Sequence, residues 1–136
     1  MSRLLPILFI LFSFGVNSAC LKSGDYVELY GRLVVKQFPN PLAESDNPTE
    51  NKFYSKWMLE LDPPLTCVTD VDDETFKNWN KEVQLFQGEK ISKDEMDKMK
   101  NKHVHFSGEL SVAAGAPFEF AAVGLDVEKA FLAPVE

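Results

Sequence analysis

The only two histidines of the chain, His103 and His105, are separated by a single residue. On a β-strand this spacing places both imidazoles on one face, and Glu109 falls on the same face. Imidazole and carboxylate groups bind zinc, so these three residues are a candidate metal site. Two histidines are few for a zinc site, however, and two surface histidines are the simpler interpretation. We therefore expect neither a metal ion nor another cofactor.

A second group of side chains that could bind a cation is the acidic run from Asp70 to Glu74. Carboxylates are the ligands of calcium sites, but this run lacks the spacing and the glycine of an EF-hand loop. A solvated acidic loop is the interpretation that we favour for its members, which are Asp70, Asp72, Asp73 and Glu74.

The chain contains none of the short motifs that mark common catalytic sites. It has no Gly-x-Ser-x-Gly nucleophile elbow, no phosphate-binding loop and no His-Glu-x-x-His pair. A carboxylate pair for glycoside hydrolysis stays open because 21 acidic residues are present, but their spacing singles out no two of them. We therefore expect a protein without enzymatic activity, with an envelope-polymer hydrolase as the third hypothesis.

The hydrophobic pattern predicts a small β-protein with one helix. Apolar and polar residues alternate in five segments, which is typical of half-buried strands. A capping box of Ser92 and Glu95 begins a short helix between the third and fourth segments, with Met96 and Met99 as its apolar stripe. The first four predicted strands are Tyr26–Phe38, Phe53–Leu61, Glu82–Gln87 and His103–Val112. Phe118–Phe131 is predicted to form a fifth strand or a strand pair, with Phe118, Phe120 and Ala122 pointing into the barrel.

Gly31 interrupts the apolar side of the first predicted strand, where a glycine commonly marks a bend or a close backbone approach. A long, bent first strand is what a small closed barrel requires. With a helix between strands three and four, the order predicts a five-stranded OB-like barrel, formed as one domain by residues 20–136. A small antiparallel sandwich is the alternative.

An OB barrel commonly binds its ligand on the outer face of strands two and three. Tyrosine and arginine suit such a contact surface because they combine apolar area with directed polar groups. The alternation predicts an outward-facing patch for a protein or a saccharide, and its members are Tyr30, Arg32, Tyr54, Lys56 and Met58.

The charge balance is acidic, with 14 Lys and Arg residues against 21 Asp and Glu residues and a net charge of −7. Binding to nucleic acid needs a positively charged surface or groove. We therefore exclude nucleic acid as a partner.

Residues 1–19 have the pattern of a secretory signal peptide. Arg3 is their only charged residue, an apolar stretch follows from Leu4 to Val16, and small residues end the segment at Ala19. The stretch is short for a membrane-spanning helix, which needs about 20 apolar residues, and no later segment is long enough. We expect cleavage near Ala19 and a periplasmic or secreted protein that has no transmembrane segment.

Cys20 and Cys67 are the only cysteines, and two interpretations compete for them. An oxidising compartment allows a disulfide between them, for which the chain-entropy model gives about 4 kcal/mol. Alternatively, Ser18-Ala19-Cys20 is a bacterial lipobox with a lipid on Cys20, although Asn17 stands where that motif usually has an apolar residue. We favour the disulfide, because a lipidated Cys20 leaves Cys67 without a partner.

Several short motifs occur in the order Ala19-Cys20-Leu21, Val27–Leu33, Phe38-Pro39-Asn40-Pro41, Trp57–Pro63 and Cys67-Val68. Together with residues 82–85 and the strand after residue 103, they resemble a domain family of unknown function found in short exported bacterial proteins. The resemblance covers most of residues 20–125. It implies a disulfide between the two cysteines and a bacterial envelope setting, but no established activity. Members often carry a His-rich hairpin near the C-terminus, whereas residues 113–117 here are Ala-Ala-Gly-Ala-Pro.

These observations favour a non-catalytic exported binding module of the bacterial envelope. The alternative is a periplasmic inhibitor or immunity protein against a cell-wall hydrolase or a secreted toxin. Such targets are usually basic, and an acidic surface would steer their association.

Overall fold

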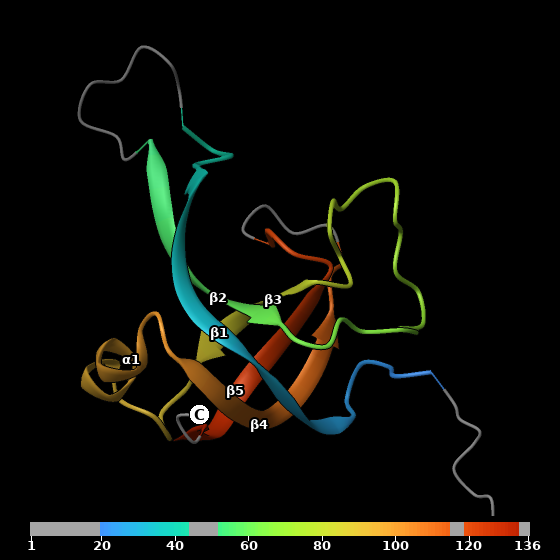
Figure 1. Ribbon diagram of the computed structural model, residues 1–136. Helices are drawn as coiled ribbons and strands as arrows, with labels where there is room; N and C mark the ends of the chain where they lie inside the picture. Colours follow the sequence, from blue (N-terminus) through green and yellow to red (C-terminus); the bar gives the residue numbers. More distant parts are fainter. Residues whose placement is uncertain (1–19, 44–51, 115–118, 134–136) are drawn as a thin grey trace, which may run out of the picture.

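The computed structural model describes residues 20–43, 52–114 and 119–133 (Figure 1). The elements follow the predicted order of three strands, one helix and two strands, and their residues alternate in burial as expected for a barrel wall. They are β1 (Tyr26–Pro39), β2 (Phe53–Leu61), β3 (Glu82–Gln87), α1 (Lys93–Met99), β4 (His103–Val112) and β5 (Val123–Leu132).

The five strands close into a barrel in the order β1-β2-β3-β5-β4. Neighbouring strands are antiparallel except β3 and β5, which run parallel. With α1 placed between β3 and β4, this arrangement confirms the predicted OB-like barrel and not the sandwich alternative.

Strand β1 is long and bent, and it belongs to two sides of the barrel (Figure 1). Its first part, Tyr26–Arg32, pairs with β4, and its second part, Gly31–Pro39, pairs with β2. The two pairings meet at Gly31, where any Cβ atom would overlap with the carbonyl oxygen of Glu60. The close backbone approach predicted for Gly31 is therefore confirmed, because only glycine leaves room for the neighbouring strand.

The interior of the barrel holds one cluster of buried apolar side chains. Helix α1 contributes Met96 and Met99 to this cluster from one end, as its two-residue stripe predicts. The Ser92–Glu95 capping box is also present. The barrel strands supply most of the remaining members, which are Leu29, Leu33, Leu59, Leu61, Val83, Leu85, Val104, Phe106, Leu110, Val123, Leu125 and Val127.

A disulfide joins Cys20 to Cys67, with their Cα atoms 4.9 Å apart. Leu21 and Val68 form a parallel bridge beside it, in which the Leu21 N–H donates to the Cys67 carbonyl at 3.1 Å. The disulfide therefore attaches the chain before β1 to the connection that follows β2. The Asp62–Pro63 peptide bond at the start of that connection is cis.

The fifth predicted strand, Phe118–Phe131, is wrong at its start, because β5 begins at Val123. Phe118 lies outside the described residues. Phe120, which was expected to point into the barrel, instead stacks on Phe38 at a centroid distance of 4.5 Å. Aromatic residues favour strands, but here the ring packs in a connection between strands.

In the described part of the chain, no helix has the length and apolar character needed to cross a bilayer. The expected signal peptide, residues 1–19, lies outside the described residues.

Candidate functional site

Four rings pack against one another on the outside of β1, β4 and β5, and we call them the ring stack. Tyr30 of β1 contacts both imidazoles of β4, with centroid distances of 5.7 Å to His103 and 4.7 Å to His105. His105 in turn stacks on Phe131 at 5.1 Å with an interplanar angle of 20°. The two histidines and one predicted contact residue, Tyr30, therefore belong to one cluster.

The strand register explains the ring stack. Tyr30 is directly opposite His105, and His105 is directly opposite Phe131. Adjacent strands are about 4.8 Å apart, so outward rings in one row must meet. Such aromatic pairs contribute about 0.5–1.5 kcal/mol beyond their buried area.

The ring stack remains open to solvent at one end and is charged at its side. Phe131 is 52% exposed. The Glu28 carboxylate, two residues before Tyr30 on the same face of β1, lies 3.5 Å from Nδ1 of His105. Arg32 is exposed beside His103, its partner on β4. The surface thus offers ring edges together with directed polar groups.

A groove of about 450 Å³ adjoins the ring stack, because Tyr30 belongs to both. Glu28, whose carboxylate faces His105, also lines this groove. Its other walls come from the disulfide-linked segments and are mainly apolar. They are Leu21, Leu29, Leu61, Pro63, Pro64, Leu65, Thr66 and Cys67. The ring stack and the groove therefore form one continuous surface, which we call the open face.

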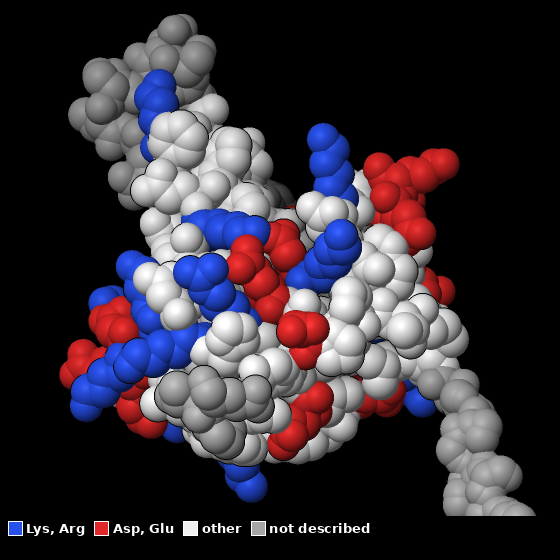
Figure 2. Space-filling model, viewed as in Figure 1, with Lys and Arg blue, Asp and Glu red and all other residues white. Residues whose placement is uncertain are grey.

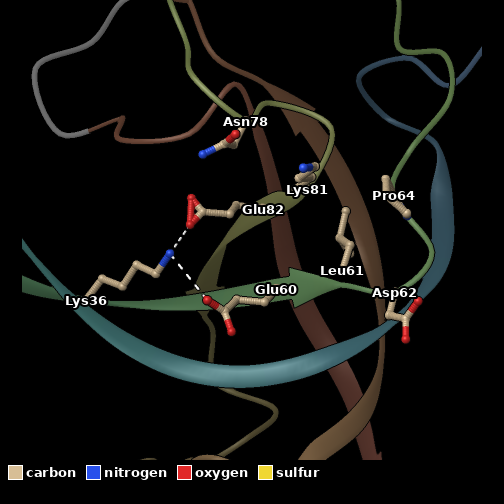
Figure 3. Close-up of a pocket in the computed structure, with 8 residues that line it drawn as sticks. All are labelled: Lys36, Glu60, Leu61, Asp62, Pro64, Asn78, Lys81 and Glu82. Carbon is tan, nitrogen blue, oxygen red and sulfur yellow. Dashed lines mark hydrogen bonds and ion pairs between the residues drawn. The ribbon is translucent and has the colours of Figure 1, made fainter.

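A second hollow, of about 480 Å³, lies beyond Leu61 and Pro64, which line both hollows. Lys36 points into it between two carboxylates (Figure 3). Its ammonium group pairs with Glu82 and lies 3.5 Å from Glu60. Since Glu60 and Glu82 are opposite each other on β2 and β3, Lys36 offsets the repulsion of two like charges.

The pKa of Lys36 reflects this arrangement. Partial burial alone lowers it, but the hydrogen bond and charge of Glu82, together with the charge of Glu60, more than offset burial and hold the pKa above its ordinary value of 10.5. A glycosidase would need the space between its two carboxylates for the scissile bond. Here the ammonium group of Lys36 occupies that space, so the arrangement is an ion-pair network.

The five predicted contact residues do not form one patch. Arg32 is opposite Glu60, whereas Lys56 is opposite Lys36 and Tyr54 is opposite Phe38. At about 3.4 Å per residue, Lys56 lies roughly 13 Å further along the strands than Arg32. Lys56 instead lies over the Tyr54 ring at 5.5 Å.

The prediction that Met58 faces solvent is wrong, because its side chain is 0% exposed. It sits on the outer face beside Gln84, which is only 2% exposed. The N–H of Phe120 donates to Oε1 of Gln84 at 2.8 Å, and the Phe120 ring stacks on Phe38. Phe120 therefore lies against the outside of β1 and β3, and we call the outer surface around Phe38, Met58 and Gln84 the covered face.

The candidate metal ligands are not brought together. Glu109 is four residues from His105 along β4, and the carboxylate facing His105 belongs to Glu28. In the acidic run, Asp72 accepts hydrogen bonds from Thr75 and from the Glu74 N–H, which lowers its pKa. Within the described ranges, no group of three or more His, Cys, Asp or Glu side chains is arranged to hold a metal ion.

Charges of both signs are interspersed on the face shown in Figure 2. Their distribution along the chain is uneven, however. Residues 60–82 contain seven acidic and two basic side chains, whereas residues 89–102, around α1, contain four acidic and five basic ones. Three of the seven acidic residues, Glu60, Asp62 and Glu82, line the second hollow.

Sequence reasoning missed Phe131 as a member of the site. Its alternation with neighbouring residues was visible, but its position opposite His105 depends on the β4–β5 register, which shifts between Ser107 and Gly108. A bulge of this kind moves every later pair by one residue, so alternation alone could not have placed the ring.

Comparisons with protein-family models, with curated proteins and with solved structures find no match to this chain. The resemblance to an exported bacterial domain family therefore stays a prediction.

Proposed function

We propose that this protein is an exported, non-catalytic binding module of the bacterial envelope, and that its ligand contacts the ring stack on the open face. The observation that carries the proposal is the ring stack itself. The core is already filled by other side chains, so the barrel does not need four more rings on its outside. Leaving apolar ring surface in water has a cost, and exposed clusters of aromatic side chains commonly mark interaction sites.

The composition of the open face supports recognition of a partner. Tyrosine, phenylalanine and arginine are enriched in binding interfaces, and a few such residues usually carry most of the binding energy. Tyr30, Phe131 and the neighbouring Arg32 provide this combination. The groove beside Tyr30 adds a recess that an apolar group of the ligand can fill.

Two features support export. Residues 1–19 have the pattern of a signal peptide, and the Cys20–Cys67 disulfide is a bond that reducing compartments rarely maintain. The disulfide also occupies Cys20, which a lipid anchor would require to be free.

The test compares ligand recovery by variants of the open face. We expect immobilised wild-type protein to recover a stoichiometric component from an envelope extract of the producing cells. Tyr30→Ala combined with Phe131→Ala should reduce that recovery at least about tenfold, because the two proposed contact rings of Tyr30 and Phe131 are both removed. The double variant should remain folded because both side chains lie outside the core, although the lost ring contacts should lower its melting temperature.

Phe53→Ala is the matched control. Phe53 is 62% exposed and stands at the start of β2, outside the open face. It should bind as the wild type does. Equal recovery by the double variant and the wild type would remove the open face as the binding site.

A second candidate function is inhibition of a cell-wall hydrolase or a secreted toxin. The excess of acidic side chains in residues 60–82 favours it, because a negative surface accelerates association with a basic protein. Recovery of a single basic hydrolase from the same extract, with loss of its activity in the complex, is the expected result for this candidate.

A further inference from the structure

Two acidic residues lie near Tyr30 of the ring stack. Glu28 stands two residues before Tyr30 on the same face of β1. Asp62 is held on the other side, because its N–H donates to the Tyr30 carbonyl at 3.0 Å. Tyr30 therefore has one acidic residue two positions before it on β1 and another whose backbone is bonded to its own at the end of β2.

Among the described residues, neither carboxylate forms an ion pair with a lysine or an arginine, although Arg32 stands two residues after Tyr30 on the same face of β1. Glu28 faces only the imidazole of His105, and it is 56% exposed. For Asp62, no ion pair or side-chain hydrogen bond is found among the described residues. Figure 3 shows Asp62 at the opposite end of its hollow from Lys36, whose ammonium group is directed at Glu60 and Glu82.

The lining of the two hollows is negative as a whole. Four carboxylates contribute to it, against two ammonium groups, and Lys36 is already paired with two of the carboxylates. In the groove nearest Tyr30, Glu28 is the only acidic or basic side chain among the lining residues, and the walls are mainly leucine and proline. A complementary ligand is therefore positively charged beside Tyr30 and apolar next to that charge.

We propose that the open face binds a positively charged segment of a protein partner. An arginine or lysine side chain lies on the Tyr30 ring between Glu28 and Asp62, and a neighbouring apolar side chain enters the groove between Tyr30 and Leu65. This inference rests on the proposed function and names the class of ligand. Cation–π attraction and two charge contacts act together at this site.

Charge complementarity favours this occupant over the other polymers of an envelope. A neutral saccharide can donate hydrogen bonds to the carboxylates but gains no charge attraction from them, and anionic polymers are repelled by them. The mainly apolar walls of the groove favour an apolar group next to the cation. A peptide segment in which basic and apolar side chains alternate supplies both groups. A protein segment is therefore the occupant that uses both features.

The test uses a capped hexapeptide of alternating arginine and leucine as the probe, titrated into the full protein and followed by amide NMR spectra. We expect shifts of the amide signals of residues 28–32 and of Leu61, Asp62, Leu65 and Thr66. Raising sodium chloride from about 50 mM to about 500 mM shortens the Debye length about threefold and should weaken binding. The same peptide with neutral citrulline in place of arginine should bind at least about fivefold more weakly.

Charge-neutralising variants locate the contact. Glu28→Gln and Asp62→Asn should each weaken peptide binding about two- to fivefold, the range for an exposed ion pair. Glu109→Gln is the matched control, because it removes the same charge from an exposed position on the outer face of β4, away from the groove. It should change the affinity less than about 1.5-fold, since a general charge effect is then the only one acting.

Three results would overturn the inference: equal binding of the citrulline peptide, equal weakening by Glu109→Gln and Glu28→Gln, or no shifts on the open face. A neutral chitin oligosaccharide is titrated in parallel. If it shifts the open-face amides while the arginine peptide does not, the cationic segment is rejected and the proposed binding face is retained. The proposed function fails separately, if removal of Tyr30 and Phe131 leaves recovery from the envelope extract unchanged.

Discussion

The two outer faces of the barrel have similar strand patterns and opposite surroundings. On the covered face, Met58 and Gln84 are buried, and Phe120 is held there by a ring contact with Phe38 and a hydrogen bond to Gln84. On the open face, the rings of Tyr30 and Phe131 have no such cover and Phe131 is half exposed. Both faces include part of β1, which passes from one to the other at Gly31.

The difference shows that pointing away from a barrel is not the same as facing solvent. An outward side chain becomes part of a second small core when another segment of the chain packs over it. The outer face of strands two and three, which OB barrels commonly use for ligands, is partly occupied by the protein's own chain here. A ligand therefore has better access to the face that β1 shares with β4 and β5.

The largest difference in stability between the two faces should appear when a buried side chain is removed from the covered face. Met58→Ala should lower the free energy of unfolding by about 2–5 kcal/mol, because it deletes a fully buried side chain and leaves a cavity. Phe131→Ala, on the open face, should cost less than about 1.5 kcal/mol. Chemical denaturation measures both, and equal losses would show that the two faces do not differ in cover.

Gly31 joins the two faces, and a side chain there should disturb both. Gly31→Ala places a Cβ atom against the backbone of Glu60, so we expect a loss of about 1–3 kcal/mol or more in the free energy of unfolding. Gly88→Ala is the control, because its Cβ would lie 3.3 Å from a side-chain oxygen of Asp126 and 3.9 Å from the carbonyl oxygen of Val127, without the backbone overlap at Gly31. Equal melting temperatures for the two variants would contradict the close approach at Gly31.

Replacing Lys36 should give the smallest change in the free energy of unfolding, and this change should depend on pH. Lys36→Met should cost at most about 1 kcal/mol at neutral pH, since the ion pairs are partly exposed. The raised pKa of Lys36 means that its contribution is fully present below pH 10.5 and is lost as the pH rises through the higher folded-state value. The stability difference between wild type and variant should therefore be constant at neutral pH and vanish in strong alkali.

Lys129→Met is the control for that measurement, because it removes the same charge from an exposed position on β5. Urea denaturation at several pH values from neutral to strongly alkaline gives the comparison. A Lys36→Met difference that grows with rising pH would show that the ammonium group does not stabilise the pair of Glu60 and Glu82.

Local patterns predicted much of the fold. The bounds of β2, β3 and β4 agree with the alternation of apolar and polar residues, because a strand with one face in the core must show that alternation. The capping box predicted the start of α1 because both of its hydrogen bonds join residues three positions apart. The start of β5 was missed, since the preceding aromatic residue packs in a connection.

The candidate site was predicted less completely. Tyr30 and Arg32 were placed on a contact surface, and they lie on or beside the open face, but Tyr54 and Lys56 lie further along the strands. The side chain of Met58 points away from the barrel interior, as predicted, but it is buried. Phe120, more than sixty positions later in the chain, packs on the same outer face. Contacts at such separations leave no periodic pattern in the sequence.

The sequence by itself determined which side of each strand turns inward, where the helix begins and which residue permits the bend in β1. These features follow from short-range geometry: a two-residue period, a three-residue cap and a missing Cβ. Only the tertiary structure decided which outward side chains meet across strands and which the chain covers. Those outcomes depend on register and on the path of a distant connection, so packing between remote segments produced both the ring stack and the burial of Met58.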